Sequence, residues 1–240
     1  MIYTKKSLVS ASMCDGKATL SPLAAFQLVE DAVTELLGEL HIDGVTAMRE
    51  YGATWVFVKT VIRFYQRPSW PEGLEIRSFV SAHSSAKLFV DTEIISSADK
   101  TAVIHARLEL CALDLASGSI RKASSVGVEK DAPCETALPD LAFDRFPKAE
   151  TEVVETAVVR STNLDYNFHT NNVEYVRFIL NTYQAKYLAE RDVGQIEIHY
   201  GCQTFEGDTI QIAKHTEGTK DFFRLQSNEK VVAECIIAWK

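Results

Sequence analysis

The sequence predicts an α+β fold that consists of two similar halves. Each half shows a short strand, a loop, a long apolar helix and then about four strand-like runs. A helix that is apolar over a wide arc has to be enclosed, and a curved antiparallel sheet wrapped around it would do so. Because one order of elements occurs twice in the chain, an internal duplication is expected.

The two helices have clear start signals. Ser21 can cap the first helix, Pro22 suits its first position, and Gly38 suits the position just past its end. Asn171 or Asn172 can cap the second helix, which is expected to continue to Leu188. The apolar residues at helical spacing in the second segment are Val173, Val176, Ile179, Leu180, Tyr183, Tyr187 and Leu188.

The strands follow from alternating side chains and from the turn residues between them. In the first half they are expected at 53–66, 74–82, 85–96 and 102–115. In the second half they are expected at 153–159, 194–201, 208–215, 220–226 and 230–239. The proline-containing, acidic stretch 131–150 is interpreted as a linker between a first half, 1–130, and a second half, 151–240.

Composition excludes several classes of protein. The 240 residues carry 25 basic and 33 acidic side chains, a net charge of −8, so a nucleic-acid partner is not expected. No apolar stretch approaches the ~20 residues of a membrane span, and no secretory signal is recognisable. The five cysteines are widely spaced and include no Cys-x-x-Cys, which indicates reduced thiols in a cytoplasmic protein and no metal site.

One polar segment could carry chemistry. Asp165, Asn167 and His169 alternate with Tyr166 and Phe168, so in an extended segment the polar trio would share one side and the two aromatic anchors the other. The segment leads into the second helix, whose N-terminal N–H groups can stabilise an oxyanion. This combination suits hydrolysis of an activated acyl group, although the same residue types also build ordinary loops and helix caps.

The segment resembles a known family signature. Asp165-x-Asn167-x-His169-x-Asn171-Asn172, followed by Tyr175, is similar to the motif of acyl-ACP thioesterases, which release fatty acids from acyl carrier protein (ACP). Trp55, the stretch from Arg63 to Pro68 and the two-half layout also resemble this family, whose members have a double hot-dog fold. The resemblance implies two fused hot-dog halves, each a central helix wrapped by an antiparallel sheet.

The resemblance also implies roles for the residues of the motif. Asp165 would act on water as general base or, alternatively, attack the thioester carbon directly. Asn167 would hold the carboxylate or the carbonyl, and His169 would orient or share the proton. Backbone N–H groups near Asn171 and Asn172 would face the oxyanion.

The sequence departs from the family at one place. Members carry a Glu-Cys pair after the histidine, whereas an alignment on Gly207-Asp208 places Gln203 and Thr204 there. A shift of two residues would bring in Cys202, which would share a strand face with Thr204. Gln203 cannot act as a base but can fix a water molecule, so an Asp165-centred reaction is favoured. A Cys202 nucleophile, activated by His199, is the less favoured alternative.

Other candidates lie in the first half. Lys59, Arg63 and Arg67 would share one strand face, either as a contact for an acidic carrier or as an ordinary solvated face. Phe26 and Trp55 would line the acyl chain or belong to the core. The matching segment of this half holds Asp15 but no Asn-x-His, so only the second half is expected to catalyse.

The function predicted from these observations is hydrolysis of acyl-ACP to free fatty acid and holo-ACP, in a monomer or homodimer. No cofactor and no metal are implied, because water is the second substrate. Two alternatives stay open. One is an acyl-CoA thioesterase, and the other is a non-catalytic module that binds or senses acyl thioesters. A hydratase would need a different arrangement of His and Asp.

Overall fold

The computed structural model describes residues 1–148 and 150–240. The chain forms two compact units, Met1–Ala142 and Phe143–Lys240. Their boundary falls inside the predicted linker 131–150, of which position 149 lies outside the described residues. The first compact unit therefore ends at Ala142, twelve residues beyond residue 130, where the first half was expected to end.

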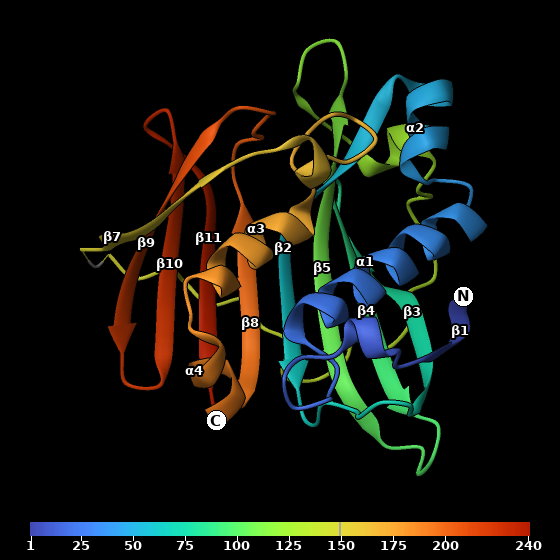
Figure 1. Cartoon of the computed structure of the whole chain (residues 1–240). Coiled ribbons are helices and arrows are strands. Elements are labelled where there is room, and N and C mark those ends of the chain that lie inside the picture. Colours follow the sequence, from blue (N-terminus) through green and yellow to red (C-terminus); the bar gives the residue numbers. More distant parts are fainter. Residues whose placement is uncertain (149) are drawn as a thin grey trace. The chain divides into compact units, whose positions relative to one another are not determined.

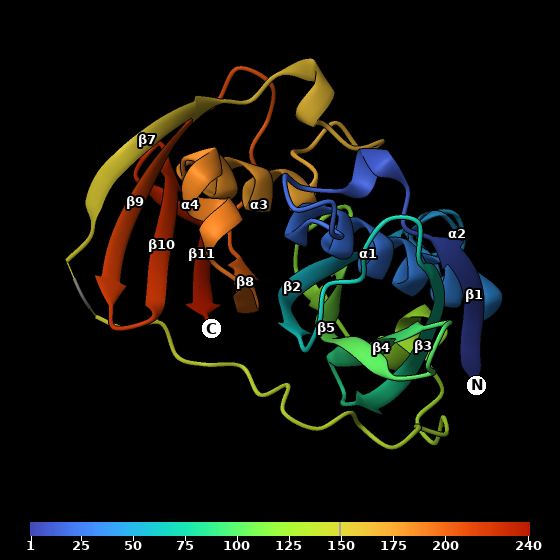
Figure 2. The ribbon, with the colours of Figure 1, turned by 60° about the horizontal axis from the view of Figure 1, so that its bottom comes forward.

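In the first unit an antiparallel sheet curves around a long helix (Figures 1 and 2). The sheet order is β1-β3-β4-β5-β2, with β6 paired to β5. The elements are β1 (Ile2–Leu8), α1 (Pro22–Glu39), α2 (Gly44–Tyr51), β2 (Ala53–Phe64), β3 (Gly73–His83), β4 (Lys87–Ser96), β5 (Ala102–Asp114) and β6 (Ile120–Arg121). Short 3₁₀ turns lie at Ala11–Met13 and Ala123–Val126.

The second unit repeats this plan. Its sheet runs in the order β8-β11-β10-β9-β7 and curves around two short helices (Figure 2). The elements are β7 (Glu152–Val158), a 3₁₀ turn (Ser161–Asn163), α3 (Asn172–Asn181), α4 (Ala185–Glu190), β8 (Val193–Tyr200), β9 (Thr209–Glu217), β10 (Lys220–Ser227) and β11 (Lys230–Trp239). The predicted α+β class and its helix-in-sheet halves are confirmed.

Helix α1 begins where its sequence signals predict, but it runs through Gly38, which was expected just past its end, and stops at Glu39. The Ser21 hydroxyl accepts a hydrogen bond from the N–H of Ala24, at 3.1 Å, and Pro22 occupies the first helical position. Phe26, Val29 and Val33 are fully buried. The helix is thus enclosed on the face that carries its large apolar side chains.

The second helix is not continuous, which corrects the expectation of one helix up to Leu188. It stops at Asn181, and α4 restarts at Ala185. The break places the Tyr183 hydroxyl 2.6 Å from the buried carboxylate of Asp221, which also accepts a hydrogen bond from the Trp239 indole. Burial is the largest cause of a raised pKa at Tyr183, and the neighbouring Asp221 raises this pKa further. The phenol therefore stays protonated and donates its hydrogen bond. A buried carboxylate needs such donors, and this requirement outweighs helical periodicity.

The segment that joins the halves is tied to buried carboxylates. Asp91 on β4 accepts the N–H of Leu138 at 2.7 Å, while Arg107 donates to Asp91 and to the carbonyl groups of Leu138 and Leu141. In the second unit, Glu197 accepts the N–H of Asp144. The segment 131–142 therefore packs on the first unit rather than spanning free of it.

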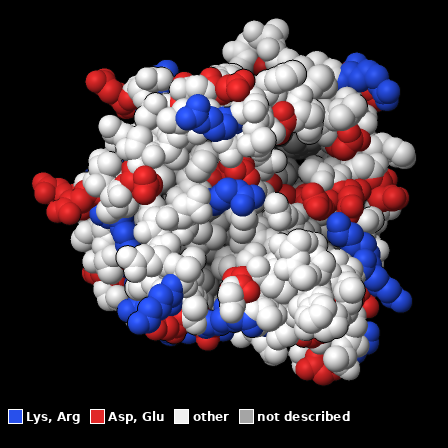
Figure 3. All heavy atoms as spheres, in the orientation of Figure 1, with Lys and Arg blue, Asp and Glu red and all other residues white. Residues whose placement is uncertain are grey.

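Charge is dispersed on the face shown in Figure 3, where acidic and basic side chains alternate with uncharged ones. Among the described residues, no helix is both long enough and apolar enough to cross a membrane.

Candidate active site

The Asp165–His169 segment is a tight turn between the 3₁₀ turn and α3. The N–H of Asp165 donates to the carbonyl of His169 at 2.8 Å, and Phe168 adopts a positive φ of 61°. The expected extended segment is therefore wrong, and so is the expectation that two aromatic side chains anchor it. Tyr166 and Phe168 are 70% and 77% exposed. The physical reason is the Asp165 carboxylate, which binds the backbone of its own turn instead of leaving it extended.

The two oxygens of the Asp165 carboxylate have different surroundings. Oδ1 accepts the N–H groups of Asn167 and His169, at 2.8 and 3.2 Å. Among the described residues, none donates a hydrogen bond to Oδ2. One oxygen thus holds the carboxylate in place and the other is available to a water molecule or a substrate.

Helix α3 starts directly after this turn, and most of the N–H groups at its start donate hydrogen bonds within the chain. The N–H of Asn171 donates to the carbonyl of Asn163, and the Asn171 side chain caps the helix by accepting the N–H of Val173 at 2.9 Å. The N–H of Glu174 donates to the carbonyl of Asn171. Within the described chain, only the N–H of Asn172 among these residues has no acceptor, so it is the group that the start of the helix leaves available.

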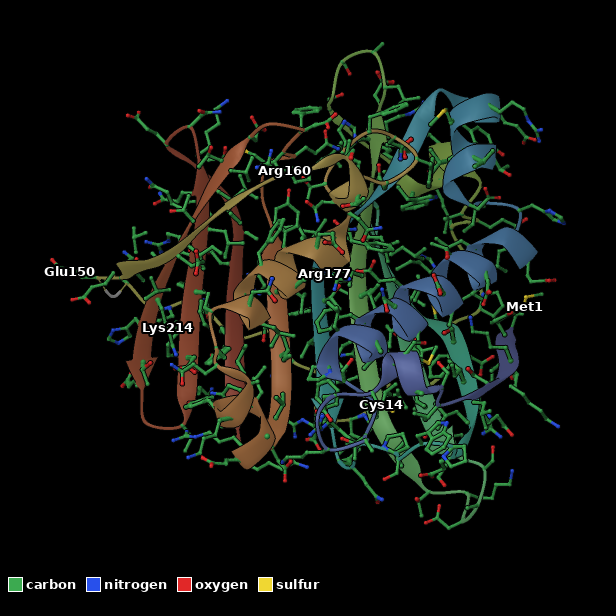
Figure 4. All side chains as sticks on the ribbon, in the orientation of Figure 1. Met1, Cys14, Glu150, Arg160, Arg177 and Lys214 are labelled. Carbon is green, nitrogen blue, oxygen red and sulfur yellow. The ribbon has the colours of Figure 1, made fainter. Side chains whose placement is uncertain are left out.

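A polar network braces the turn from the side of α3. The Asn163 side chain accepts the N–H of Arg160 and donates to Glu174 at 2.7 Å, and Arg177 donates to both oxygens of Glu174. Figure 4 labels Arg160, where the turn segment begins, and Arg177 on α3. The sequence analysis missed this network; the only sequence signal for it is the polar residue at 163 where the first half has Met13.

The loop 201–208, which follows β8, lies against the turn. The carbonyl of Thr204 accepts the N–H of Thr170 at 2.9 Å, and the rings of His169 and Phe205 meet edge to face with centroids 5.1 Å apart. Gln203 is exposed in this loop, whereas Thr204 is 1% exposed. The structure thus brings the loop of Gln203 beside the turn that carries Asp165, Asn167 and His169.

Cys202 does not share a strand face with Thr204, as the sequence suggested. Both residues lie in the loop beyond β8, with Cys202 exposed and Thr204 buried. His199, the expected activator of Cys202, instead contacts the buried carboxylate of Glu197 at 2.5 Å. Within the described residues, no hydrogen bond joins Cys202 to an imidazole, which leaves its thiol without the base that a nucleophile needs.

The first-half candidates lie in the other unit. Phe26 is fully buried on α1, and the Trp55 indole donates to the carbonyl of Ile42 at 2.7 Å. A part for either in holding an acyl chain stays a prediction. Arg67 does not belong to a solvated face with Lys59 and Arg63, because its side chain is 8% exposed and forms an ion pair with Asp15.

The first unit contains a copy of the turn. Residues 11–20 and 161–170 show the same sequence of buried and exposed positions. The Asp15 carboxylate accepts the N–H of Lys17, as Asp165 accepts that of Asn167, and Ala18 has a φ of 55° like Phe168. Figure 4 labels Cys14, at the start of this copy. The predicted duplication therefore extends to the hydrogen bonds of the turn.

Comparison with known proteins agrees with this architecture. Residues 147–240 match the family described as acyl-ACP thioesterase C-terminal domain. An acyl-ACP thioesterase from Bacteroides thetaiotaomicron superposes with a TM-score of 0.91 at 16% identity, over 100% of this chain and 98% of that one. The 12:0-ACP thioesterase from Umbellularia californica superposes with a TM-score of 0.83 at 12% identity, over 100% and 97%. No curated protein matches in sequence.

The solved structures show that the fold is the double hot-dog fold, and the family match covers the half that carries the Asp165 turn. The resemblance predicted from the motif is thereby confirmed for residues 147–240. Residues 147–240, which carry Asp165, are therefore similar to the C-terminal domains of acyl-ACP thioesterases, within a chain that has the double hot-dog fold.

Proposed function

We propose that the protein hydrolyses acyl-ACP thioesters to a free fatty acid and holo-ACP, with Asp165 as general base. The observation that carries the proposal is the asymmetric carboxylate of Asp165. Its Oδ1 is held by two N–H groups, and its Oδ2 receives no hydrogen bond within the described chain. A carboxylate fixed in this way can accept a proton without first reorganising its surroundings.

The reaction then follows in two steps. Oδ2 of Asp165 takes a proton from a water molecule while the water oxygen bonds to the thioester carbon. The N–H of Asn172 and the side-chain amide of Asn167 donate to the oxyanion that forms. When the tetrahedral intermediate collapses, the carbon–sulfur bond breaks and the proton held by Asp165 passes to the leaving thiolate. The products are the carboxylic acid and the free thiol of the carrier.

Two further side chains would support this reaction. Gln203, exposed in the adjoining loop, can hold the attacking water by hydrogen bonds but cannot deprotonate it. His169, packed against Phe205, can orient the water or share the proton. Thr204 is buried beneath the site, with its hydroxyl bonded to Thr170 and Tyr175, so it acts as a support rather than as a contact for substrate.

A panel of acyl-ACP and acyl-CoA thioesters, followed by release of free thiol, tests the proposal. We expect turnover with acyl-ACP and much weaker turnover with the matching acyl-CoA. Release from CoA alone would instead assign an acyl-CoA thioesterase. Binding without release would assign a module that senses acyl thioesters. The monomer or homodimer and the cytoplasmic location stay predictions.

A further inference from the structure

Each unit joins its turn to the loop that follows the first strand after its helices, β2 or β8. In the first unit the N–H of Leu20 donates to the carbonyl of Pro68, at 2.8 Å. In the second unit the N–H of Thr170 donates to the carbonyl of Thr204, at 2.9 Å. Leu20 and Thr170 are counterparts in the duplicated turn, so Pro68 and Thr204 are counterparts as well. Gln203 therefore occupies the position of Arg67.

The first unit reinforces this contact through its aspartate. Arg67 pairs with Oδ2 of Asp15 and also donates to the carbonyl of Leu20 at 3.3 Å. Oδ1 of Asp15 accepts the N–H of Lys17 and the hydroxyl of Thr19. Both oxygens of this carboxylate are thus occupied, and the turn and the loop are clamped together across the place where a substrate would meet the carboxylate.

The second unit has no cation at position 203 to form such an ion pair, and it connects the same two segments from beneath. The Tyr175 hydroxyl lies 2.8 Å from the Thr204 hydroxyl, which lies 2.7 Å from the Thr170 hydroxyl. The Thr170 hydroxyl also lies 3.1 Å from the Thr204 carbonyl. The three hydroxyl protons therefore fit one directed chain, from Tyr175 to Thr204, from Thr204 to Thr170, and from Thr170 to the carbonyl.

The hydroxyl chain is buried and belongs to one unit only. Tyr175, Thr204 and Thr170 are 3%, 1% and 5% exposed. Burial raises the pKa of Tyr175, which keeps its phenol protonated as the donor that starts the chain. The counterparts in the first unit are Ala25, Pro68 and Leu20, none of which has a side-chain hydroxyl. The first unit therefore joins its turn and loop by the Arg67–Asp15 ion pair, and the second unit joins them by the hydroxyl chain.

We infer that Tyr175, Thr204 and Thr170 are positioning residues whose buried hydroxyl chain holds the Gln203 loop against the catalytic turn and so leaves Oδ2 of Asp165 free. The inference rests on the proposed function. The ion pair of the first unit would hold the same two segments equally well, but it would occupy the carboxylate that must accept the proton. Moving the clamp beneath the site separates support from catalysis.

Removal of the hydroxyl chain tests this. In Thr204→Val we expect kcat to fall about 10- to 100-fold with KM changed less than about twofold, because the loop shifts while the residues that contact substrate remain. Tyr175→Phe should lower kcat about threefold to tenfold, and Thr204→Ser should restore it close to the wild-type value. Tyr183→Phe, which removes a buried hydroxyl bonded to Asp221, is the matched control and should leave kcat unchanged.

Amide hydrogen exchange at Thr170 measures the clamp independently of activity. We expect exchange about tenfold faster in Thr204→Val and unchanged in Tyr183→Phe. In the Thr204→Val background, Gln203→Arg supplies the first unit's ion pair, so it should restore slow exchange at Thr170 while turnover stays lost. Exchange that stays fast in this double variant would contradict the equivalence of the two clamps.

The outcomes separate the two proposals. Wild-type protein that releases no thiol from any thioester would overturn the proposed function, and the exchange experiment would still decide whether the clamp exists. Wild-type turnover that survives unchanged in both Thr204→Val and Tyr175→Phe would overturn the positioning role. So would a fall in kcat without faster exchange at Thr170, because the effect would not then pass through the loop.

Discussion

At the scale of single residues, the carboxylates of Asp15 and Asp165 lie in the same kind of turn and differ above all in the partner of Oδ2. Oδ1 accepts the N–H of Lys17 and the Thr19 hydroxyl in Asp15, and the N–H groups of Asn167 and His169 in Asp165. Arg67 occupies Oδ2 of Asp15, and no described residue occupies Oδ2 of Asp165. The same substitution at the two aspartates therefore separates an effect on turnover from an effect on stability.

Asp165→Asn is expected to lower kcat for acyl-ACP by at least about 10²-fold, because an amide cannot accept the proton of the attacking water. The fold should persist, since the amide oxygen can still accept the N–H groups of Asn167 and His169. Thiol release and circular dichroism measure the two effects. Full activity in this variant would remove Asp165 from the reaction.

The same substitution in the first unit, Asp15→Asn, is expected to keep turnover and to lower the free energy of unfolding by about 2 kcal/mol, the contribution of a charged hydrogen bond. Urea denaturation measures the loss. A variant that kept full stability would show that the ion pair with Arg67 contributes nothing, and one that lost turnover would extend the reaction to the first unit.

Asp15 also predicts a pH dependence. Burial by itself would raise its pKa, but the hydrogen bonds from Arg67 and from the N–H of Lys17 outweigh burial and lower the pKa. The folded-state pKa thus lies below the unfolded value of about 3.9, so the unfolded state binds more protons in this range. The stabilisation is present above the unfolded pKa and is lost as the pH falls through the folded one. Urea unfolding between about pH 2.5 and 5 should show a shallower pH slope in Asp15→Asn than in the wild type.

At the scale of elements, α1 and α3 have equivalent N-caps, but only α3 follows a turn that carries the proposed catalytic residues. Ser21 caps α1 through the N–H of Ala24, and Asn171 caps α3 through the N–H of Val173. Helix α3 begins directly after the turn that carries Asp165, and its Asn172 N–H is the candidate donor to the oxyanion. A change at the start of α3 should therefore affect both stability and rate.

Asn171→Ala and Ser21→Ala should each lower the free energy of unfolding by about 1 kcal/mol, the usual contribution of an N-cap. Only Asn171→Ala should also lower kcat, by about tenfold, because fraying of α3 displaces the Asn172 N–H. Urea unfolding together with thiol release distinguishes the two caps. Equal rates in both variants would show that the start of α3 takes no part in catalysis.

At the scale of the whole molecule, the segment between the halves is bound to the first unit by an arginine fork and by backbone hydrogen bonds from Glu135 to Val80 and from Leu138 to Asp91. Arg107 donates to both oxygens of Asp91 at 2.7 Å and reaches the carbonyl groups of Leu138 and Leu141. Lysine cannot reproduce a fork of this kind. The attachment of residues 131–142 should depend on the guanidinium group rather than on its charge.

Arg107→Lys is expected to increase the rate of proteolysis within 131–142 about tenfold, because the segment detaches more often from its sheet. Thermolysin digestion followed by mass spectrometry locates the cut. Arg77→Lys is the matched control, since Arg77 pairs with Glu75 of its own strand β3. If both variants were cut at the same rate, the fork would have no part in holding the segment.

The sequence by itself determined the α+β class, the duplicated order of elements, the helix start at Pro22 and the motif that includes Asp165, because periodicity, capping and spacing are local properties. It could not determine that residues 165–169 form a turn, that α3 ends at Asn181, or that Arg67 is withdrawn from the surface. Those features depend on partners distant in sequence, such as Asp221 for Tyr183 and Asp15 for Arg67. A buried charge or hydroxyl must be satisfied by whichever group the fold brings beside it, and only the tertiary structure decides which group that is.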